Sequence, residues 1–225
     1  KMTDVKPFTL SDKEMVSVLC GQAAIAIENA RLYQKVEDSY IGIIAALAST
    51  IEARDSYTAG HVIRMAEYSC LIAEELGLPE DEIESVKRAA LLHDIGKIGI
   101  PDHILLKSGA LSENESQIMK THPEIGSRIM NNMVDMDGIS MVIKHHHEHF
   151  DGNGYPSGLK GEEIPKGARI LAVADTFEAM TTARPYREPL PVSRAQEEIK
   201  KYAGTQFDPE VAEAFMKVLS KKGVI

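Results

Sequence analysis

The chain has 225 residues, enough for one domain with its own hydrophobic core and an additional helix. Its formal net charge is −9 and its isoelectric point is near 5.4. An acidic chain lacks the basic face that neutralises the phosphates of a duplex, so duplex nucleic acid is excluded as a partner. No apolar run approaches the roughly 20 residues that span a bilayer, and no secretory signal is visible. We therefore expect a cytoplasmic protein.

The first predicted element is a long helix over residues 11–51. Apolar residues recur along it at spacings of three and four, which is typical of one helical face: Val16, Leu19, Ala23, Ile27 and Ala30. Ser11 and Glu14 have the spacing of a capping box at its start. This apolar surface predicts either a linker between domains or pairing with a second copy in a homodimer. A core helix of one compact domain is the alternative.

The rest of the chain also has helical periodicity. Gly77 ends one pattern and Pro79 suits the first turn of the next, whereas Gly96, Gly99 and Pro101 interrupt the chain after residue 94. Helices are predicted over residues 58–76, 79–94, 138–147, 168–182, 193–202 and 209–221, with shorter ones after Ser112 and at Pro123. No strand alternation is visible, so the predicted fold class is all-α.

Residues 151–167 are dense in glycine and proline and predict a loop, either ordered or disordered. Glycines in such a loop serve turns with positive φ.

Several polar residues lie where a helix should be apolar or should end. His93 and Asp94 are adjacent at the close of an apolar helix, where they can offer an imidazole and a carboxylate to one metal ion. Asp175 lies within an apolar helix, where a charge is unfavourable unless it is paired or binds a metal. A run of three histidines, 145–147, lies at another helix end. Each feature alone has an ordinary structural explanation, because short motifs also arise by chance.

The order of these residues favours a metal-dependent enzyme. His61, then His93-Asp94, then Asp175 resembles the H…HD…D pattern of the HD superfamily of metal-dependent phosphohydrolases. Three longer segments resemble the HD-GYP family of bacterial signalling phosphodiesterases: AALLHDIGKIGIPDHILLK (89–107), HHEHFDGNGYPSGLKGEEIP (146–165) and ARILAVADTFEAMTTARPYR (168–187).

Gly154-Tyr155-Pro156 is the tripeptide after which the HD-GYP family is named. The resemblance covers about residues 45–219. It implies an HD-type multi-helix bundle with a long N-terminal linker helix and a Gly/Pro-rich GYP loop.

The resemblance also implies a set of metal ligands. One ion would be held by His61, His93, Asp94 and Asp175, and a second by His122, His146 and His147, with Asp94 bridging the two. Family members often use iron, which is our first choice, with manganese the second; imidazole with carboxylate also suits zinc. Members with three metals carry a Glu where this chain has Tyr57, so two ions are expected.

Two ions about 3.5–4 Å apart would activate a shared water for in-line attack on phosphorus. In the family, the lysine of the HDIGK segment faces the phosphate, so Asp94 and Lys97 are the predicted catalytic residues and Lys97 also binds substrate. Arg184 and Arg187 are further candidates for the phosphate, because arginine suits bidentate recognition. Tyr186 is a candidate for packing on a guanine base. A plain surface loop is the alternative for Tyr186 and Arg187.

Other residues have weaker predicted roles. Glu148 and Asp151 are candidates to orient the ligand imidazoles. Glu178 stands where the family usually has Asp, and we expect a small effect on substrate fit or none. The remaining histidines are expected at the surface or beside the ligands: His103, His145 and His149.

The N-terminal segment has a resemblance of its own. GQAAIAIENARLYQ (21–34) resembles the last helix of a GAF sensory domain. Residues 1–40 are therefore predicted to be the tail of such a domain with a linker helix, and residues 41–225 the HD-GYP domain.

The leading hypothesis is a phosphodiesterase that hydrolyses cyclic di-GMP to linear 5′-pGpG, with further hydrolysis to GMP left open. A second is a module that senses the dinucleotide, or docks a cyclase, without hydrolysis. Cyclic GMP-AMP is an alternative substrate, and a mononucleotide hydrolase is disfavoured by the long GYP segment. Retention of all the implied ligands and of Lys97 favours an enzyme. In the family the GYP segment is also associated with contacts to diguanylate cyclase domains, which are therefore predicted partners.

Overall fold

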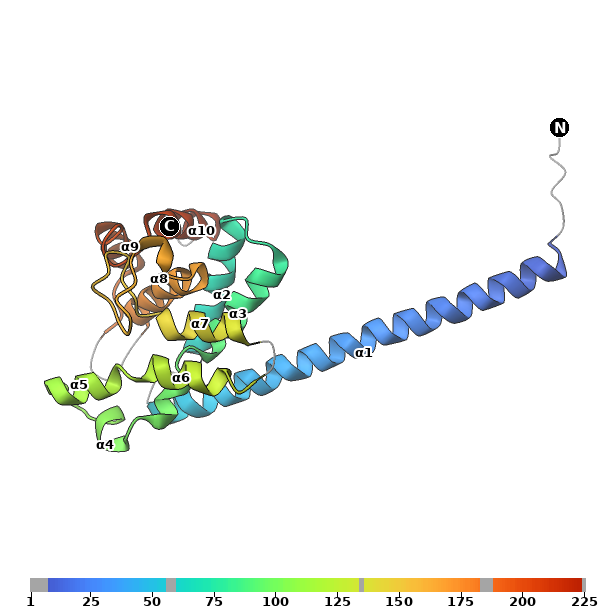
Figure 1. The fold of residues 1–225 in the computed structure, drawn as a ribbon. Helices are drawn as coiled ribbons and strands as arrows, with labels where there is room; N and C mark the ends of the chain where they lie inside the picture. Colours follow the sequence, from blue (N-terminus) through green and yellow to red (C-terminus); the bar gives the residue numbers. More distant parts are fainter. Residues whose placement is uncertain (1–7, 56–59, 134–135, 183–187, 224–225) are drawn as a thin grey trace. The chain divides into compact units, whose positions relative to one another are not determined.

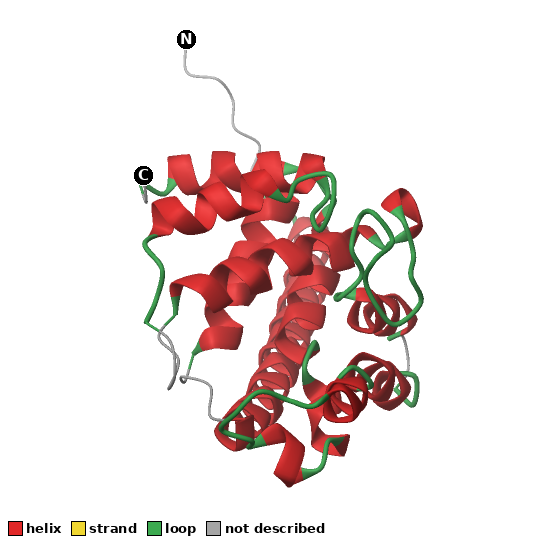
Figure 2. Cartoon of the chain, turned by 90° about the vertical axis from the view of Figure 1, so that its left-hand side faces the viewer, coloured by secondary structure: helices red, strands yellow, loops and turns green. Residues whose placement is uncertain are grey.

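The computed structural model describes residues 8–55, 60–133, 136–182 and 188–223 (Figure 1). The chain divides into two units, residues 1–43 and 44–225. The described residues form helices and loops with one isolated bridge, between Ala203 and Phe207, and no strand (Figure 2). The prediction of an all-α fold is confirmed. None of the described helices is both long enough and apolar enough to cross a membrane.

Helix α1 (Leu10–Asp55) begins in the first unit and ends in the second. At its start the Asp12 N–H donates to Thr9 Oγ1 at 3.2 Å, and the Thr9 N–H donates to Asp12 Oδ2 at 2.8 Å. The predicted capping pair, Ser11 and Glu14, is therefore wrong by two residues, because Ser11 already lies in the first helical turn. The apolar face of α1 in the first unit is exposed, as at Leu19 (60%).

The second unit contains the remaining elements in chain order (Figure 1). They are α2 (His61–Glu75), α3 (Glu80–Leu92), the 3₁₀ turn η1 (Ile95–Gly99), α4 (Asp102–Leu105), α5 (Glu113–Met119), α6 (His122–Met130), α7 (Asp137–His145), the 3₁₀ turn η2 (Gly161–Glu163), α8 (Lys166–Thr181), α9 (Val192–Lys201) and α10 (Pro209–Lys221). The sequence predicted the longer helices but neither α4 nor the 3₁₀ turns, which are too short to show a period.

Local signals fix where several of these helices begin and end. Helix α5 begins with a complete capping box, in which Ser112 Oγ accepts from the Glu115 N–H. Helix α2 ends with Gly77 at φ 72°, and the Leu78 N–H donates to the Ala73 carbonyl at 3.0 Å. This pattern is the Schellman motif, which satisfies carbonyls at a helix end.

The core of the second unit lies where α2 packs against α3, α8 and α10. Met65, Leu171 and Phe215 are fully buried there. The Phe177 ring lies edge-on to the Phe215 ring at 4.8 Å between centroids, which is a favourable aromatic arrangement. The Phe177 ring also lies edge-on to the Tyr68 ring of α2, at 5.3 Å between centroids. Helices α2 and α8 are thus packed side by side, and each carries a residue of the predicted metal centre.

Helices α6 and α7 pack on each other, and α6 also packs on η1. The approach of η1 to α6 requires a glycine, because a Cβ on Gly96 would lie 1.9 Å from the His122 carbonyl oxygen and 2.5 Å from the Gly126 nitrogen. The turn that follows Asp94 is therefore in backbone contact with the helix that begins at His122.

The loop between α7 and α8 is ordered. The Asp151 N–H donates to the Thr205 carbonyl at 2.8 Å, and the Gly161 N–H donates to the Phe150 carbonyl at 2.9 Å. Of its glycines, Gly152, Gly158 and Gly161 have positive φ, as predicted. Gly154 serves a close approach instead, because a Cβ there would lie 2.2 Å from the His149 nitrogen.

The contact at Gly96 gives a first prediction. Gly96→Ala would force the backbones of η1 and α6 apart, so we expect it to lower the free energy of unfolding by at least about 3 kcal/mol, the upper part of the range for overpacked sites. Urea denaturation measures this change. Gly109→Ala, where nothing lies near the added methyl, is the control and should stay within about 0.5 kcal/mol of wild type. Equal stabilities for the two variants would contradict the prediction.

Candidate metal centre

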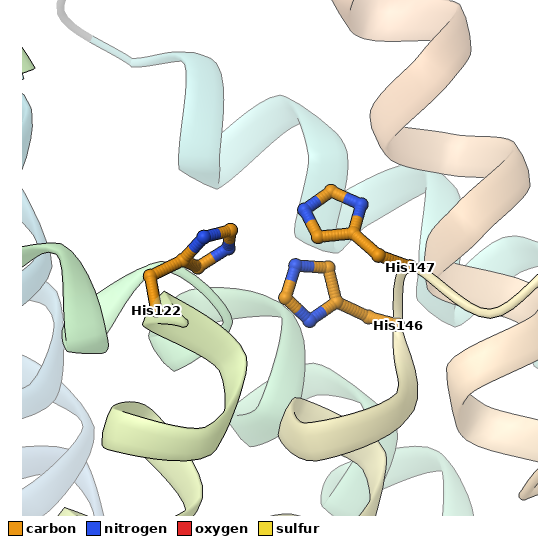
Figure 3. A group of neighbouring side chains, drawn as sticks. All are labelled: His122, His146 and His147. Carbon is orange, nitrogen blue, oxygen red and sulfur yellow. The ribbon is translucent and has the colours of Figure 1, made fainter. Parts of the chain in front are cut away.

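Three histidines lie together where the start of α6 is close to the end of α7: His122, His146 and His147 (Figure 3). His122 is the first residue of α6, and the other two follow the last residue of α7. One nitrogen from each ring lies within 4.8 Å of the others. The His146 and His147 ring centroids are 4.0 Å apart.

Backbone carbonyls orient the buried imidazoles. His122 Nδ1 lies 2.9 Å from the Met119 carbonyl oxygen, and His146 Nδ1 lies 2.7 Å from that of Ile143. An Nδ1–H that donates to this carbonyl leaves Nε2 with its lone pair facing the other rings. Both Nε2 atoms are buried and neither makes a hydrogen bond within the described part of the chain, an arrangement suited to a metal ion.

Burial also keeps these imidazoles neutral. It lowers the pKa of His122, and it lowers the pKa of His146 well below its usual value with the neighbouring His147 adding to the effect. Burial and the neighbouring His122 lower the pKa of His147 to about 3. A metal binds only unprotonated imidazole, so the three rings have the protonation state of ligands at neutral pH.

A second group consists of His61, His93 and Asp175, with one ligand atom from each within 4.8 Å of the others. His61 begins α2, His93 follows the end of α3, and Asp175 lies on α8. His93 Nδ1 lies 2.8 Å from the carbonyl oxygen of Ala90, three residues earlier, so the orientation seen in the first group recurs here. His61 Nε2 lies 3.5 Å from Asp175 Oδ1.

This second group favours positive charge. Burial alone would lower the pKa of His61, but the nearby carboxylates of Asp175 and Glu178 outweigh it and raise the pKa to about 9. Burial would raise the pKa of Asp175, yet the contact with His61 and the nearby His93 hold it below its usual value. Asp175 is thus a half-buried carboxylate that stays ionised, and a divalent cation bound there would satisfy its charge in place of the proton on His61.

Asp94 lies between the two groups. Its Oδ2 is 3.3 Å from His93 Nε2, and its Oδ1 is 3.3 Å from His122 Nε2. Lys97 Nζ lies 2.8 Å from Oδ2. Burial would raise the pKa of Asp94, but Lys97 and His93 hold it well below its usual range. One ionised carboxylate therefore offers one oxygen to each group, as a bridging ligand does.

The structure thus brings the predicted ligands together. They are His61, His93, Asp94, His122, His146, His147 and Asp175, with Lys97 beside Asp94. The predicted substrate contacts Arg184, Tyr186 and Arg187 lie outside the described residues, as does Tyr57.

Glu178 has a larger role than the sequence predicted. It is 3% exposed, and its Oε1 accepts from Arg64 at 2.6 Å and from Thr182 Oγ1 at 2.8 Å. The same oxygen lies 3.8 Å from His61 Nδ1. Glu178 therefore faces the side of the His61 ring opposite Asp175 and restrains that ring. Its spacing of three residues from Asp175 on one helix was the signal for a shared face.

Glu148 contacts a histidine outside the predicted ligand set and the backbone of the GYP loop. Its Oε1 accepts from the Ser157 N–H at 2.7 Å and lies 3.4 Å from Nδ1 of His145. His145 is buried next to His146 in the chain, which is the second of the two expectations for it. Asp151 accepts from the Asn153 N–H at 2.9 Å. Both carboxylates thus stabilise the GYP loop itself.

The GYP loop reaches the centre through Tyr155. Its ring stacks on the His147 ring with 4.8 Å between centroids, and Lys120 Nζ lies 5.3 Å from the Tyr155 centroid. Burial, together with Asp94 and Asp175, raises the pKa of Tyr155, so its hydroxyl stays protonated. The loop therefore covers one ligand histidine.

The position of Glu178 gives a second prediction. Glu178→Gln removes the charge that restrains His61, so we expect the affinity for Mn²⁺ to fall about 10-fold, the low end for residues that support metal ligands. Calorimetric titration of the metal-free protein measures it. The exposed Glu162→Gln is the matched control and should bind as wild type. Unchanged affinity in Glu178→Gln would mean that His61 is held by other contacts.

Comparison with known proteins identifies the family of the chain. A family model described as the HD domain matches residues 43–211. The cyclic di-GMP phosphodiesterase response regulator RpfG of Xanthomonas campestris pv. campestris is 41% identical over 202 residues, which are 87% of this chain and 53% of the relative. The 3′3′-cGAMP-specific phosphodiesterase 2 of Vibrio cholerae is 35% identical over 207 residues, 91% of this chain and 40% of that relative.

A solved structure has the same fold. The crystal structure of V-cGAP3, a cyclic GMP-AMP specific phosphodiesterase of V. cholerae, matches 80% of this chain and 49% of its own with a TM-score of 0.63 and 20% identity. The chain spans about half the length of the curated relatives it matches, or less. Since the family model covers three quarters of the chain and every predicted ligand, the chain belongs to the HD domain family.

Proposed function

We propose that this chain is a metal-dependent phosphodiesterase of the HD-GYP type that hydrolyses a cyclic dinucleotide, with cyclic di-GMP as the leading substrate. One observation carries the proposal: the Asp94 carboxylate lies between two groups of inward-facing ligand residues. The identity with RpfG, whose name states a cyclic di-GMP phosphodiesterase, supports the choice of substrate.

The donor set fits two divalent ions. One ion would be held by His61, His93 and Asp175. The other would be held by His122, His146 and His147, and Asp94 would bind both ions. Iron is the first choice and manganese the second, since mixed imidazole and carboxylate ligands suit both. When bound, such ions supply Lewis acidity and lower the pKa of a shared water.

The chain's own residues serve the phosphate. Lys97 is 8% exposed, and its ammonium beside Asp94 is positioned to donate a hydrogen bond to a phosphoryl oxygen of the substrate. A fixed cation at the point where charge grows stabilises the transition state. Arg184 and Arg187 are proposed to bind the phosphates and Tyr186 to pack on guanine.

The deciding experiment follows turnover of cyclic di-GMP by anaerobically purified protein, with metal counted on the same sample. We expect hydrolysis to linear 5′-pGpG with about two irons or manganeses per chain, and loss on chelation. Asp94→Ala should lower turnover by at least about 100-fold, since it removes the shared carboxylate. Asp81→Ala, at an exposed carboxylate in the first turn of α3, is the control.

Two other results would change the proposal. Faster turnover of cyclic GMP-AMP would favour the activity in the name of the V. cholerae relative. A fully metallated protein that binds the dinucleotide and leaves it intact would move the chain to the sensor class.

We further propose that the protein forms a homodimer through α1. In the first unit this helix exposes Val16 (50%) and Leu19 (60%), which lie on one face at i and i+3. Exposed apolar residues at this spacing are buried when two helices pair.

The double variant Val16→Glu with Leu19→Glu should sediment as a monomer, because the paired helices would have to bury like charges. Sedimentation velocity distinguishes it from the wild-type dimer. The control adds the same charges at exposed polar positions, Gln22→Glu with Asn29→Glu, and should stay dimeric. A monomeric wild type at tens of micromolar would contradict the proposal.

Three predictions stay proposals. They are a GAF-like tail in residues 1–40 before an HD-GYP domain in residues 41–225, docking of diguanylate cyclase domains on the GYP loop, and a cytoplasmic location.

A further inference from the structure

The last turn of α1 carries an arginine that binds the backbone of η1. Arg54 Nη1 donates to the carbonyls of Lys97 (3.3 Å) and Ile98 (3.2 Å), and Nη2 donates to that of Ile100 (3.0 Å). Its Nε and Nη2 also donate to Asp102 Oδ1, at 3.0 and 2.5 Å. One guanidinium therefore satisfies three carbonyls of a single turn and the first carboxylate of α4.

Few side chains can do this. The guanidinium has five N–H donors in a fixed plane, whereas a lysine ammonium is a compact charge with three donors on a flexible stem. The four acceptor oxygens are reached from three different nitrogens of the guanidinium, so the single nitrogen of an ammonium cannot bind them together. The bonds therefore fix the position of η1 relative to the end of α1.

The turn that Arg54 holds is the one that carries Lys97. The Lys97 N–H donates to the Asp94 carbonyl at 2.9 Å, and its ammonium lies 2.8 Å from Asp94 Oδ2. One residue earlier, Gly96 lies in backbone contact with α6. The Lys97 backbone thus lies between two restraints, the glycine contact with α6 and the Arg54 guanidinium.

We propose that Arg54 is a positioning residue for the phosphodiesterase reaction, which acts by fixing the η1 backbone so that the Lys97 ammonium stays beside Asp94. The inference rests on the proposed function of the same centre. It makes the C-terminal turn of α1 part of the catalytic scaffold, so that a displacement of this turn reaches Lys97 through one side chain.

Global stability depends little on this contact. The Asp102 side chain is 69% exposed, and exposed ion pairs contribute little to folding. The hydrogen bonds of Arg54 end on Asp102 and on three backbone carbonyls, and none of these acceptors belongs to a predicted metal ligand. Its loss should therefore change the order of one turn and leave metal content and melting temperature close to those of wild type.

The test compares the full chain with Arg54→Lys, which keeps the charge. We expect kcat to fall about 10- to 100-fold, the scale of a small misplacement of a catalytic group, with KM and metal content nearly unchanged. Arg194→Lys makes the same chemical change at an exposed i,i+3 pair and should behave as wild type.

A double-mutant cycle with Lys97→Ala tests the route. If Arg54 acts through Lys97, Arg54→Lys has little further effect on kcat once Lys97 is removed. An equal loss in both backgrounds would overturn the proposal, as would loss of bound metal in Arg54→Lys alone.

Amide hydrogen exchange gives a readout that is independent of turnover. Residues 95–101 should exchange faster in Arg54→Lys, while residues 166–181 of α8 keep their wild-type protection. Unchanged exchange in residues 95–101 would overturn the proposal. A wild-type protein without turnover of any dinucleotide would overturn the proposed function and this inference together, whereas equal turnover in wild type and Arg54→Lys would overturn this inference alone.

Discussion

The centre depends on the contacts of the Asp94 carboxylate, because its two oxygens face imidazoles at the ends of different helices. Oδ2 lies 3.3 Å from His93 Nε2, at the end of α3, and Oδ1 lies 3.3 Å from His122 Nε2, at the start of α6. An ionised carboxylate among buried rings is stable only with positive charge around it. The glycine at position 96 lets η1, which begins directly after Asp94, lie against the start of α6.

The ends of the helices determine the orientation of the imidazole rings. His93, His122 and His146 each place Nδ1 within 2.9 Å of a carbonyl oxygen three residues earlier, where a helix leaves that carbonyl without an intrahelical partner. The same interaction satisfies the carbonyl and directs Nε2 inward. Burial then keeps the rings of the α6–α7 group neutral, so local helix geometry and desolvation together prepare the ligands before any ion binds.

Sequence patterns were sufficient for part of this description. Periodicity located the long helices, and the order of histidines and aspartates identified the residues that the fold brings together around Asp94. Elements of four or five residues, such as α4 and η1, have no period to detect. The bonds of Arg54 could not be predicted, because they join residues more than 40 positions apart and end on backbone carbonyls, which every residue has. The contact of Glu178 with Arg64 on another helix could not be predicted either, because it has no local signal in the sequence.

The predicted ligands lie on α2, α6 and α8 and directly after α3 and α7, so most of the second unit lies between the first of them, His61, and the last, Asp175. An ion held by both ends of so long a segment would act as a reversible cross-link. Closing a long loop restricts the unfolded chain and thereby favours the folded one, as a disulfide does. Ligand binding and folding would then be linked, and each would strengthen the other. The metal-bound unit would then resist proteolysis better than the metal-free unit. Its resistance to a protease would report the fraction of the protein that holds metal.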